Sequence, residues 1–258
     1  MLDRYKKIFL ELDNEWGYVI FPDDIKDEIP LILHYHGNGG YVKNGESDWL
    51  DEPRKQIFFK PLLDAGFAIA GCHATGDHWG RQSALEKNYE FFDLLKNIDN
   101  LNINNITTWG CGLGASAAWL TSIGELNPYV SSFISQQGVL NFESIIRREK
   151  FKTQLIEAHS QNVNLEVEDA LQLFDVLNPI TITKNAAEIR KIQFPSSLFI
   201  HGDSDENVNY LENPVTLHKI LTDTNTCSKL NPLAGVGHAT YEHGDYLGAL
   251  IVEFSKKV

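Results

Sequence analysis

Short apolar runs alternate with stretches of helical periodicity along most of the chain. A continuous apolar run at 30–37 predicts a buried central strand, and further strands are predicted at 67–73, 105–110, 129–138, 195–203 and 228–235. Helices are predicted between and after them, at 59–66, 83–98, 115–124, 214–223 and 245–257. Strands that alternate with helices predict an α/β domain, whose mostly parallel sheet is covered by helices on both faces.

Two segments depart from this alternation. Residues 5–12 and 16–21, separated by a short polar turn, predict a pair of antiparallel strands. From about 141 to 191 the pattern is mainly helical and more charged, without a clear strand. We interpret this stretch as a helical insertion, the usual position of a cap or lid, within a single domain that spans residues 1–258.

Composition narrows the class of protein. The chain has 258 residues, of which 43% are hydrophobic and 22% charged, and a net charge of −13. This balance disfavours nucleic acid and anionic membranes as partners, because both require a concentrated basic face. The first 16 residues lack the apolar core of a signal peptide, no run is long enough to span a membrane, and the three cysteines form no paired framework. We therefore expect a cytoplasmic protein; the oligomeric state cannot be predicted.

A glycine-rich corner is the most informative motif. Residues 106–119, ITTWGCGLGASAAW, predict a strand, a tight turn and a helix, with the spacing of a nucleophile elbow. Gly112 stands at the centre, where such elbows carry Ser or Cys, and the Leu113 amide would point toward a developing oxyanion. A phosphate-binding loop is the alternative, although the Lys-Ser/Thr of a P-loop is lacking.

Two later loops suggest partners for this corner. Asp203 and Asp205 follow one predicted strand, and His238 follows the last one. The order of elbow, acid and histidine is that of α/β-hydrolase triads, in which the acid orients a general-base imidazole. Asp205 is favoured over Asp203 because it lies before Val208, as the acid of those hydrolases lies before a Val. Asp203 would instead cap a turn or a helix.

On these residues the sequence resembles the α/β-hydrolase superfamily, above all its esterases and prolyl-oligopeptidase-like hydrolases. The similar segments are HYHGNGG at 34–40, residues 178–208 and GVGH at 235–238. The resemblance implies the α/β-hydrolase fold and a serine-hydrolase lineage, with a small-molecule ester or related acyl substrate and no cofactor. It also implies an oxyanion hole near Gly37, Asn38 and Leu113, with Asp205 as the acid and His238 as the base.

Other candidate residues are open to simpler interpretations. A metal site built on His34, His36, His73 and His78 would lack acidic or Cys partners, so pocket-lining or structural roles are favoured and no metal is expected. The loop 73–80 either contributes Trp79 to the rim of a pocket or packs it as an ordinary aromatic. Cys111 and Ser116 lie off the apex of the elbow and are poor substitutes for a nucleophile.

Glycine at position 112 departs from the family pattern and leaves three hypotheses. In the first, the chain is a serine hydrolase with a natural or engineered loss of its nucleophile, and so has little or no acyl-enzyme activity. In the second, it is a pseudoenzyme that binds a ligand or a partner. In the third, it is a non-hydrolytic enzyme in which His238 and Asp205 abstract a proton and the oxyanion hole holds an enolate.

Overall fold

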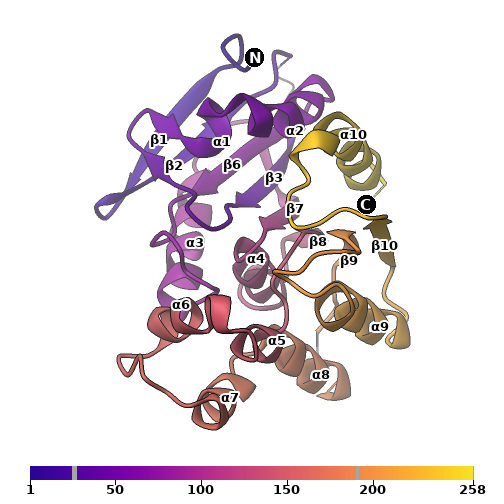
Figure 1. Cartoon of the computed structure of the whole chain (residues 1–258). Helices are drawn as coiled ribbons and strands as arrows, with labels where there is room; N and C mark the ends of the chain where they lie inside the picture. Colours follow the sequence, from indigo (N-terminus) through magenta and orange to yellow (C-terminus); the bar gives the residue numbers. More distant parts are fainter. Residues whose placement is uncertain (25–27, 190–191, 258) are drawn as a thin grey trace.

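An eight-stranded sheet forms the centre of the molecule (Figure 1). The computed structural model describes residues 1–24, 28–189 and 192–257. In spatial order the strands are β1 (Lys7–Leu12), β2 (Glu15–Ile20), β6 (Ala68–Cys72), β3 (Ile29–Tyr35), β7 (Leu101–Cys111), β8 (Val130–Gln136), β9 (Ser196–Gly202) and β10 (Ser228–Leu233).

Strand direction follows the sequence prediction. β1 and β2 pair antiparallel, β2 is antiparallel to β6, and all pairings from β6 to β10 are parallel. β3 pairs with β6 on one side and β7 on the other, so the chain reverses its direction of winding between β3 and β7. In doubly wound sheets such a switch point is where ligands bind, beyond the carboxyl ends of the strands.

Helices cover both faces of the sheet. On one face α2 (Pro53–Asp64) and α10 (Gly244–Ser255) pack side by side. α10 contributes Leu247, Ile251 and Phe254 to that core, at the three- and four-residue spacing of an apolar stripe. The other face carries α3 (Gln82–Leu95), α4 (Gly114–Ile123), α8 (Pro179–Ile189) and α9 (Thr216–Asp223).

The stretch between β8 and β9 is helical. It contains α5 (Phe142–Ile146), α6 (Glu149–His159), α7 (Val167–Asp175) and α8, which lie on the lower side of the molecule in Figure 1. α5 to α7 share an apolar cluster of their own with Trp79, Leu113 and Val208. This cluster joins the helical stretch to the loops that follow β6, β7 and β9. These contacts favour the role of a cap for the stretch, which stays a prediction. Residues 190 and 191, its expected end, lie outside the described residues.

The sequence prediction missed several local elements. α2 begins at Pro53, although only its end was predicted, and β7 begins at Leu101. Between β3 and α2 lie β4 (Val42–Lys43), β5 (Glu46–Ser47) and the short α1 (Asp48–Asp51). Further short helical turns are Leu211–Val215, before α9, and Tyr241–His243, before α10. None of the helices in the described ranges has the length and apolar character needed to cross a membrane.

Candidate active site

The glycine-rich corner joins β7 to α4 as a tight turn. A Cβ at Gly110 would lie 2.4 Å from Ala115 Cα, and a Cβ at Gly114 would lie 2.3 Å from the His36 carbonyl oxygen, so both positions exclude a side chain. Gly112, at the apex, has φ +53°, the left-handed conformation that glycine adopts without strain. The nearest atom to a Cβ at this position would be Gly37 Cα, 3.9 Å away, so a small side chain has room.

His238 and Asp205 form a hydrogen-bonded pair near this apex. His238 Nδ1 lies 2.8 Å from Asp205 Oδ2, and since a carboxylate can only accept, the imidazole donates from Nδ1. In neutral His238 this leaves Nε2 as the unprotonated nitrogen, able to accept a proton. The His238 side chain is 37% exposed, whereas that of Asp205 is fully buried. The arrangement is that of an oriented general base.

Asp205 is held by donors on both of its oxygens. Oδ1 accepts the amides of Asn207 and Val208 at 2.8 and 2.9 Å, and Oδ2 lies 3.1 Å from His201 Nε2. Burial alone raises the pKa of the Asp205 carboxyl, but hydrogen bonds from His201 and His238 outweigh burial and hold that pKa well below its usual range. Asp205 therefore stays a carboxylate throughout the range in which His238 could act as a base.

His201 was not found by sequence reasoning. It is the penultimate residue of β9 and is fully buried, so in the sequence it resembles any other residue of a central strand. Its Nε2 also lies 2.9 Å from the Val208 carbonyl oxygen, and because both neighbours accept, Nε2 carries the proton. Within the described chain, its Nδ1 is buried without a hydrogen-bond partner. His201 thus acts on His238 only through Asp205, as a positioning residue.

Asp203, the alternative acid, lies elsewhere. Its Oδ1 accepts the Gly235 amide at 2.7 Å and so joins the loop after β9 to the loop after β10. This is the turn-stabilising role that the sequence suggested for it. The structure thus brings Asp205, not Asp203, to His238.

The residues predicted to bind an oxyanion also lie at this corner. Asn38 and Gly112 line the same two hollows, and Gly37 Cα is the atom nearest to a would-be Cβ at Gly112. In the described part of the chain, the amides of Asn38 and Leu113 donate to no protein acceptor. Unpaired amides from two loops that meet at one apex are what a developing oxyanion requires.

Two hollows of different character meet at Gly112. One, of about 50 Å³, is lined by Trp79, Leu113, Val139, Phe151 and Val208. The other, of about 210 Å³, is more polar, and its walls include Asp48, Lys55, Gln137, Thr240 and Tyr241. Gly112, Asn38 and His238 line both hollows. Trp79 lines the smaller hollow and is also buried in the apolar cluster of α5 to α7, so its side chain is compatible with both interpretations that the sequence left open.

A buried ion pair in the larger hollow was also missed from the sequence. Lys55 Nζ lies 2.7 Å from Asp48 Oδ2 and 2.8 Å from Glu52 Oε1. The side chains of Lys55 and Asp48 are 11% and 3% exposed. Burial lowers the pKa of the Lys55 ammonium, but the hydrogen bonds that it donates to Asp48 and Glu52 outweigh burial and raise that pKa. Lys55 is therefore a charged donor in the wall of the pocket.

The remaining candidates of the sequence have packing roles. His34 lies among the rings of Trp49, Phe59 and Trp109, and burial lowers the pKa of its imidazole well below the usual value. His36 Nε2 lies 2.8 Å from the His73 carbonyl oxygen, which supports the loop 73–80. No three His, Cys, Asp or Glu side chains of residues 1–24, 28–189 and 192–257 gather as a metal site would require.

Neither Cys111 nor Ser116 has the properties of a nucleophile. Burial raises the pKa of the Cys111 thiol well above its usual value, and only the thiolate is strongly nucleophilic. Ser116 is fully buried and donates from Oγ to the Val139 carbonyl oxygen at 2.6 Å.

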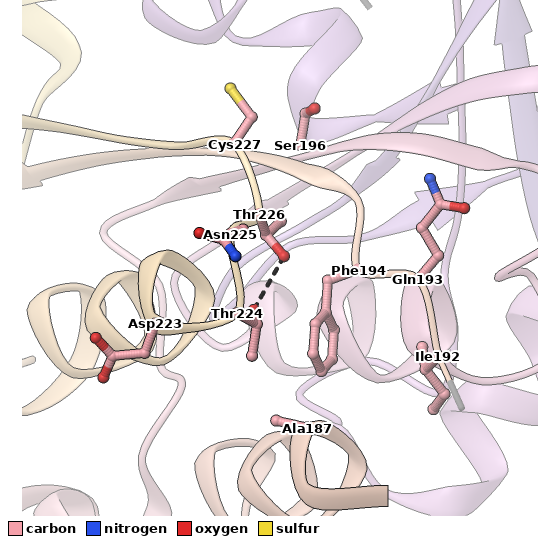
Figure 2. A pocket seen from close by; sticks show the side chains of 10 residues that line it. All are labelled: Ala187, Ile192, Gln193, Phe194, Ser196, Asp223, Thr224, Asn225, Thr226 and Cys227. Carbon is pink, nitrogen blue, oxygen red and sulfur yellow. Dashed lines mark hydrogen bonds between the residues drawn. The ribbon is translucent and has the colours of Figure 1, made fainter. Parts of the chain in front are cut away.

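A wider hollow of about 590 Å³ lies away from the corner (Figure 2). Its walls include Ser196 at the start of β9 and Cys227 just before β10, so it opens at the amino ends of these strands. Figure 2 shows Asp223 directed away from the other labelled side chains, and the hydroxyls of Thr224 and Thr226 lie 3.1 Å apart. Since ligands of such sheets bind at the opposite, carboxyl ends, the corner at Gly112 is the better candidate site.

The sequence matches no protein-family model and no curated protein. Its structure resembles Est1E from Butyrivibrio proteoclasticus, at 16% identity and TM-score 0.69, over 97% of this chain and 98% of that one. An S-formylglutathione hydrolase from Agrobacterium tumefaciens aligns at 9% identity and TM-score 0.73, over 98% and 94%. The acylaminoacyl peptidase of Pyrococcus horikoshii aligns at 16% and 0.67, over 98% of this chain but 41% of that one. Because these alignments span nearly the whole chain and the sheet has the same mostly parallel arrangement, this chain has the α/β-hydrolase fold.

Proposed function

We propose that this chain carries the site of a serine hydrolase that acts on an ester or related acyl bond, with its nucleophile lost at position 112. The observation that carries the proposal is the placement of Gly112. It stands at φ +53° with room for a small side chain. The hollows that it lines also include His238, which is hydrogen-bonded to Asp205. These positions support a hydrolase site that lacks only the attacking atom.

The chemistry follows from the roles of these groups. A carbonyl carbon above Gly112 would have its oxygen near the amides of Asn38 and Leu113, which stabilise negative charge as the carbonyl is attacked. With Ser at 112, His238 Nε2 would take the hydroxyl proton, and Asp205 would stabilise the resulting imidazolium. Two of the structural neighbours, an S-formylglutathione hydrolase and an acylaminoacyl peptidase, have names that agree with acyl chemistry of this kind.

With glycine at 112 no acyl-enzyme can form. In well-studied serine hydrolases, loss of the nucleophile lowers kcat by about 10⁶, whereas the remaining groups still give roughly 10³–10⁴ over water. We therefore propose that this chain binds its ester and hydrolyses it slowly at most, with His238 activating a water molecule.

The test is the substitution Gly112→Ser. The variant should hydrolyse simple p-nitrophenyl esters at least about 10³-fold faster than the chain as it stands, and a fluorophosphonate probe should label it covalently. The matched control is the double variant Gly112→Ser with His238→Ala, which keeps the hydroxyl but removes the base and should lose both signals. Absence of hydrolysis and labelling in a folded Gly112→Ser protein would contradict the proposal.

The same experiment separates the two alternatives. A pseudoenzyme would gain no activity from Gly112→Ser, and its thermal unfolding would be shifted by a ligand in the glycine form. A non-hydrolytic enzyme would be active in the glycine form and inactive after His238→Ala.

A further inference from the structure

The candidate site divides at Gly112 into two compartments of unequal size and polarity. We call the hollow of about 50 Å³ the small chamber and that of about 210 Å³ the large chamber. Asn38, Gly112 and His238 line both. A carbonyl group bound at the apex therefore directs one substituent into each chamber, and the chemistry of the walls decides which substituent enters which.

The small chamber has mostly apolar walls. Trp79, Val139 and Val208 are 4%, 2% and 3% exposed. Phe151, from α6, closes one side, with its ring centroid 6.0 Å from that of Trp79. An apolar wall of this kind favours a hydrocarbon group over a polar one, because no donor or acceptor replaces the water that a polar group would lose.

The walls of the small chamber are held in place by hydrogen bonds. His159, at the end of α6, lies with Nε2 2.9 Å from the Trp79 carbonyl oxygen, which can only accept. The Val139 carbonyl oxygen accepts from Ser116 Oγ at 2.6 Å. Because both walls are tied to neighbouring helices, expansion of the chamber would break buried hydrogen bonds, which typically costs about 1–3 kcal/mol each.

The volume of the small chamber sets how much of an acyl group fits inside it. An apolar cavity of about 150 Å³ accommodates benzene, which has six carbons. By that measure a chamber of about 50 Å³ accommodates about two carbons.

The large chamber is the more polar of the two, although Trp49 and Tyr241 also line it. The Lys55 ammonium and the Asp48 carboxylate form part of its wall, together with the polar side chains of Gln137 and Thr240. A hydrocarbon chain seated there would remove water from these groups without replacing its hydrogen bonds. A substituent rich in hydroxyl or amide groups would replace them.

From this pair of chambers we propose that the site is built for esters of short acyl groups, of about two carbons, with a polar alcohol. The acyl group occupies the small chamber and the alcohol the large one. This inference rests on the proposed function, since it names the substrate class of that same site.

The test uses the Gly112→Ser variant and p-nitrophenyl esters with acyl chains of two, four and eight carbons. Since the leaving group is constant, the series reports on the acyl chamber alone. We expect kcat/KM to fall at least about tenfold between the two-carbon and the eight-carbon ester. A flat series, or one that rises with chain length, would overturn the inference and leave the proposed function intact. Absence of activity and of fluorophosphonate labelling would instead overturn the proposed function.

A second variant tests the wall itself. Phe151→Ala, added to Gly112→Ser, enlarges the small chamber and should move the preference toward the four-carbon ester. Leu173→Ala is the matched control, because Leu173 packs in the same helical cluster but does not line the chamber, and the preference should stay unchanged. If circular dichroism shows that Phe151→Ala is unfolded, Phe151→Leu supplies a smaller enlargement in the same direction. A folded variant with an unaltered preference would also overturn the inference.

Discussion

At the scale of single residues, position 112 combines strain with space. A residue other than glycine held at φ +53° costs about 1–3 kcal/mol, whereas the nearest atom to a Cβ there would be 3.9 Å away. We therefore expect Gly112→Ser and Gly112→Ala to lower the free energy of unfolding by about 1–3 kcal/mol each, measured by urea denaturation. Similar losses for the two variants are expected because the strain lies in the backbone; an unchanged stability of Gly112→Ala would contradict this account.

Single residues also differ in whether the sequence alone could identify them as part of the candidate site. Gly112, Asp205 and His238 stand at fixed places after strands, so their spacing along the chain was enough to propose them. His201 and Lys55 carry no such signal, because a histidine within a strand and a lysine within a helix are ordinary in any sequence. Only the folded chain reveals that His201 reaches the Asp205 carboxylate and that Lys55 is buried against Asp48.

At the scale of elements, the corner depends on the close approach of β7, α4 and the end of β3. A Cβ at Gly114 would lie 2.3 Å from the carbonyl oxygen of His36 and 2.5 Å from that of Tyr35. Because these are backbone atoms, the loop after β3 would have to move. We expect Gly114→Ala to lower the free energy of unfolding by about 1–3 kcal/mol or more.

A matched glycine provides the control for this prediction. Gly237 has no atom within 4 Å of its would-be Cβ, and it is not among the residues with positive φ. Gly237→Ala should therefore change the stability by less than about 0.5 kcal/mol in the same denaturation experiment. Equal effects of the two substitutions would show that the close approach at Gly114 does not limit stability.

Elements with a strong local pattern were the ones that the sequence predicted. All eight strands of the main sheet were predicted, most of them from runs rich in apolar residues, and α3 had a clear apolar stripe. The start of α2 was missed because its first turns contain Lys55 and Gln56, which are buried although polar. The pair β4 and β5 was missed because strands of two residues have no periodicity to detect.

At the scale of the whole molecule, the candidate site also links parts of the fold that lie far apart in the chain. Asp205 follows β9 and His238 follows β10, while Gly112 follows β7. The Asp205 carboxylate is the centre of this link, because it accepts hydrogen bonds from the imidazoles of His201 and His238 and from two backbone amides.

This arrangement predicts how stability depends on pH. The pKa of the Asp205 carboxyl is lower in the folded chain than its usual value of about 3.9, so the folded state binds this proton less readily than the unfolded state. The resulting stabilisation is complete above about pH 4 to 5 and is lost as the pH falls toward the folded-state pKa. Asp205→Asn should remove it, which lowers the free energy of unfolding at pH 7 by about 1.5–3 kcal/mol. Denaturation at pH 7 and pH 3 would measure both effects: the loss between the two values should be smaller in Asp205→Asn than in the unsubstituted chain, and an equal loss would mean that Asp205 does not contribute to acid unfolding.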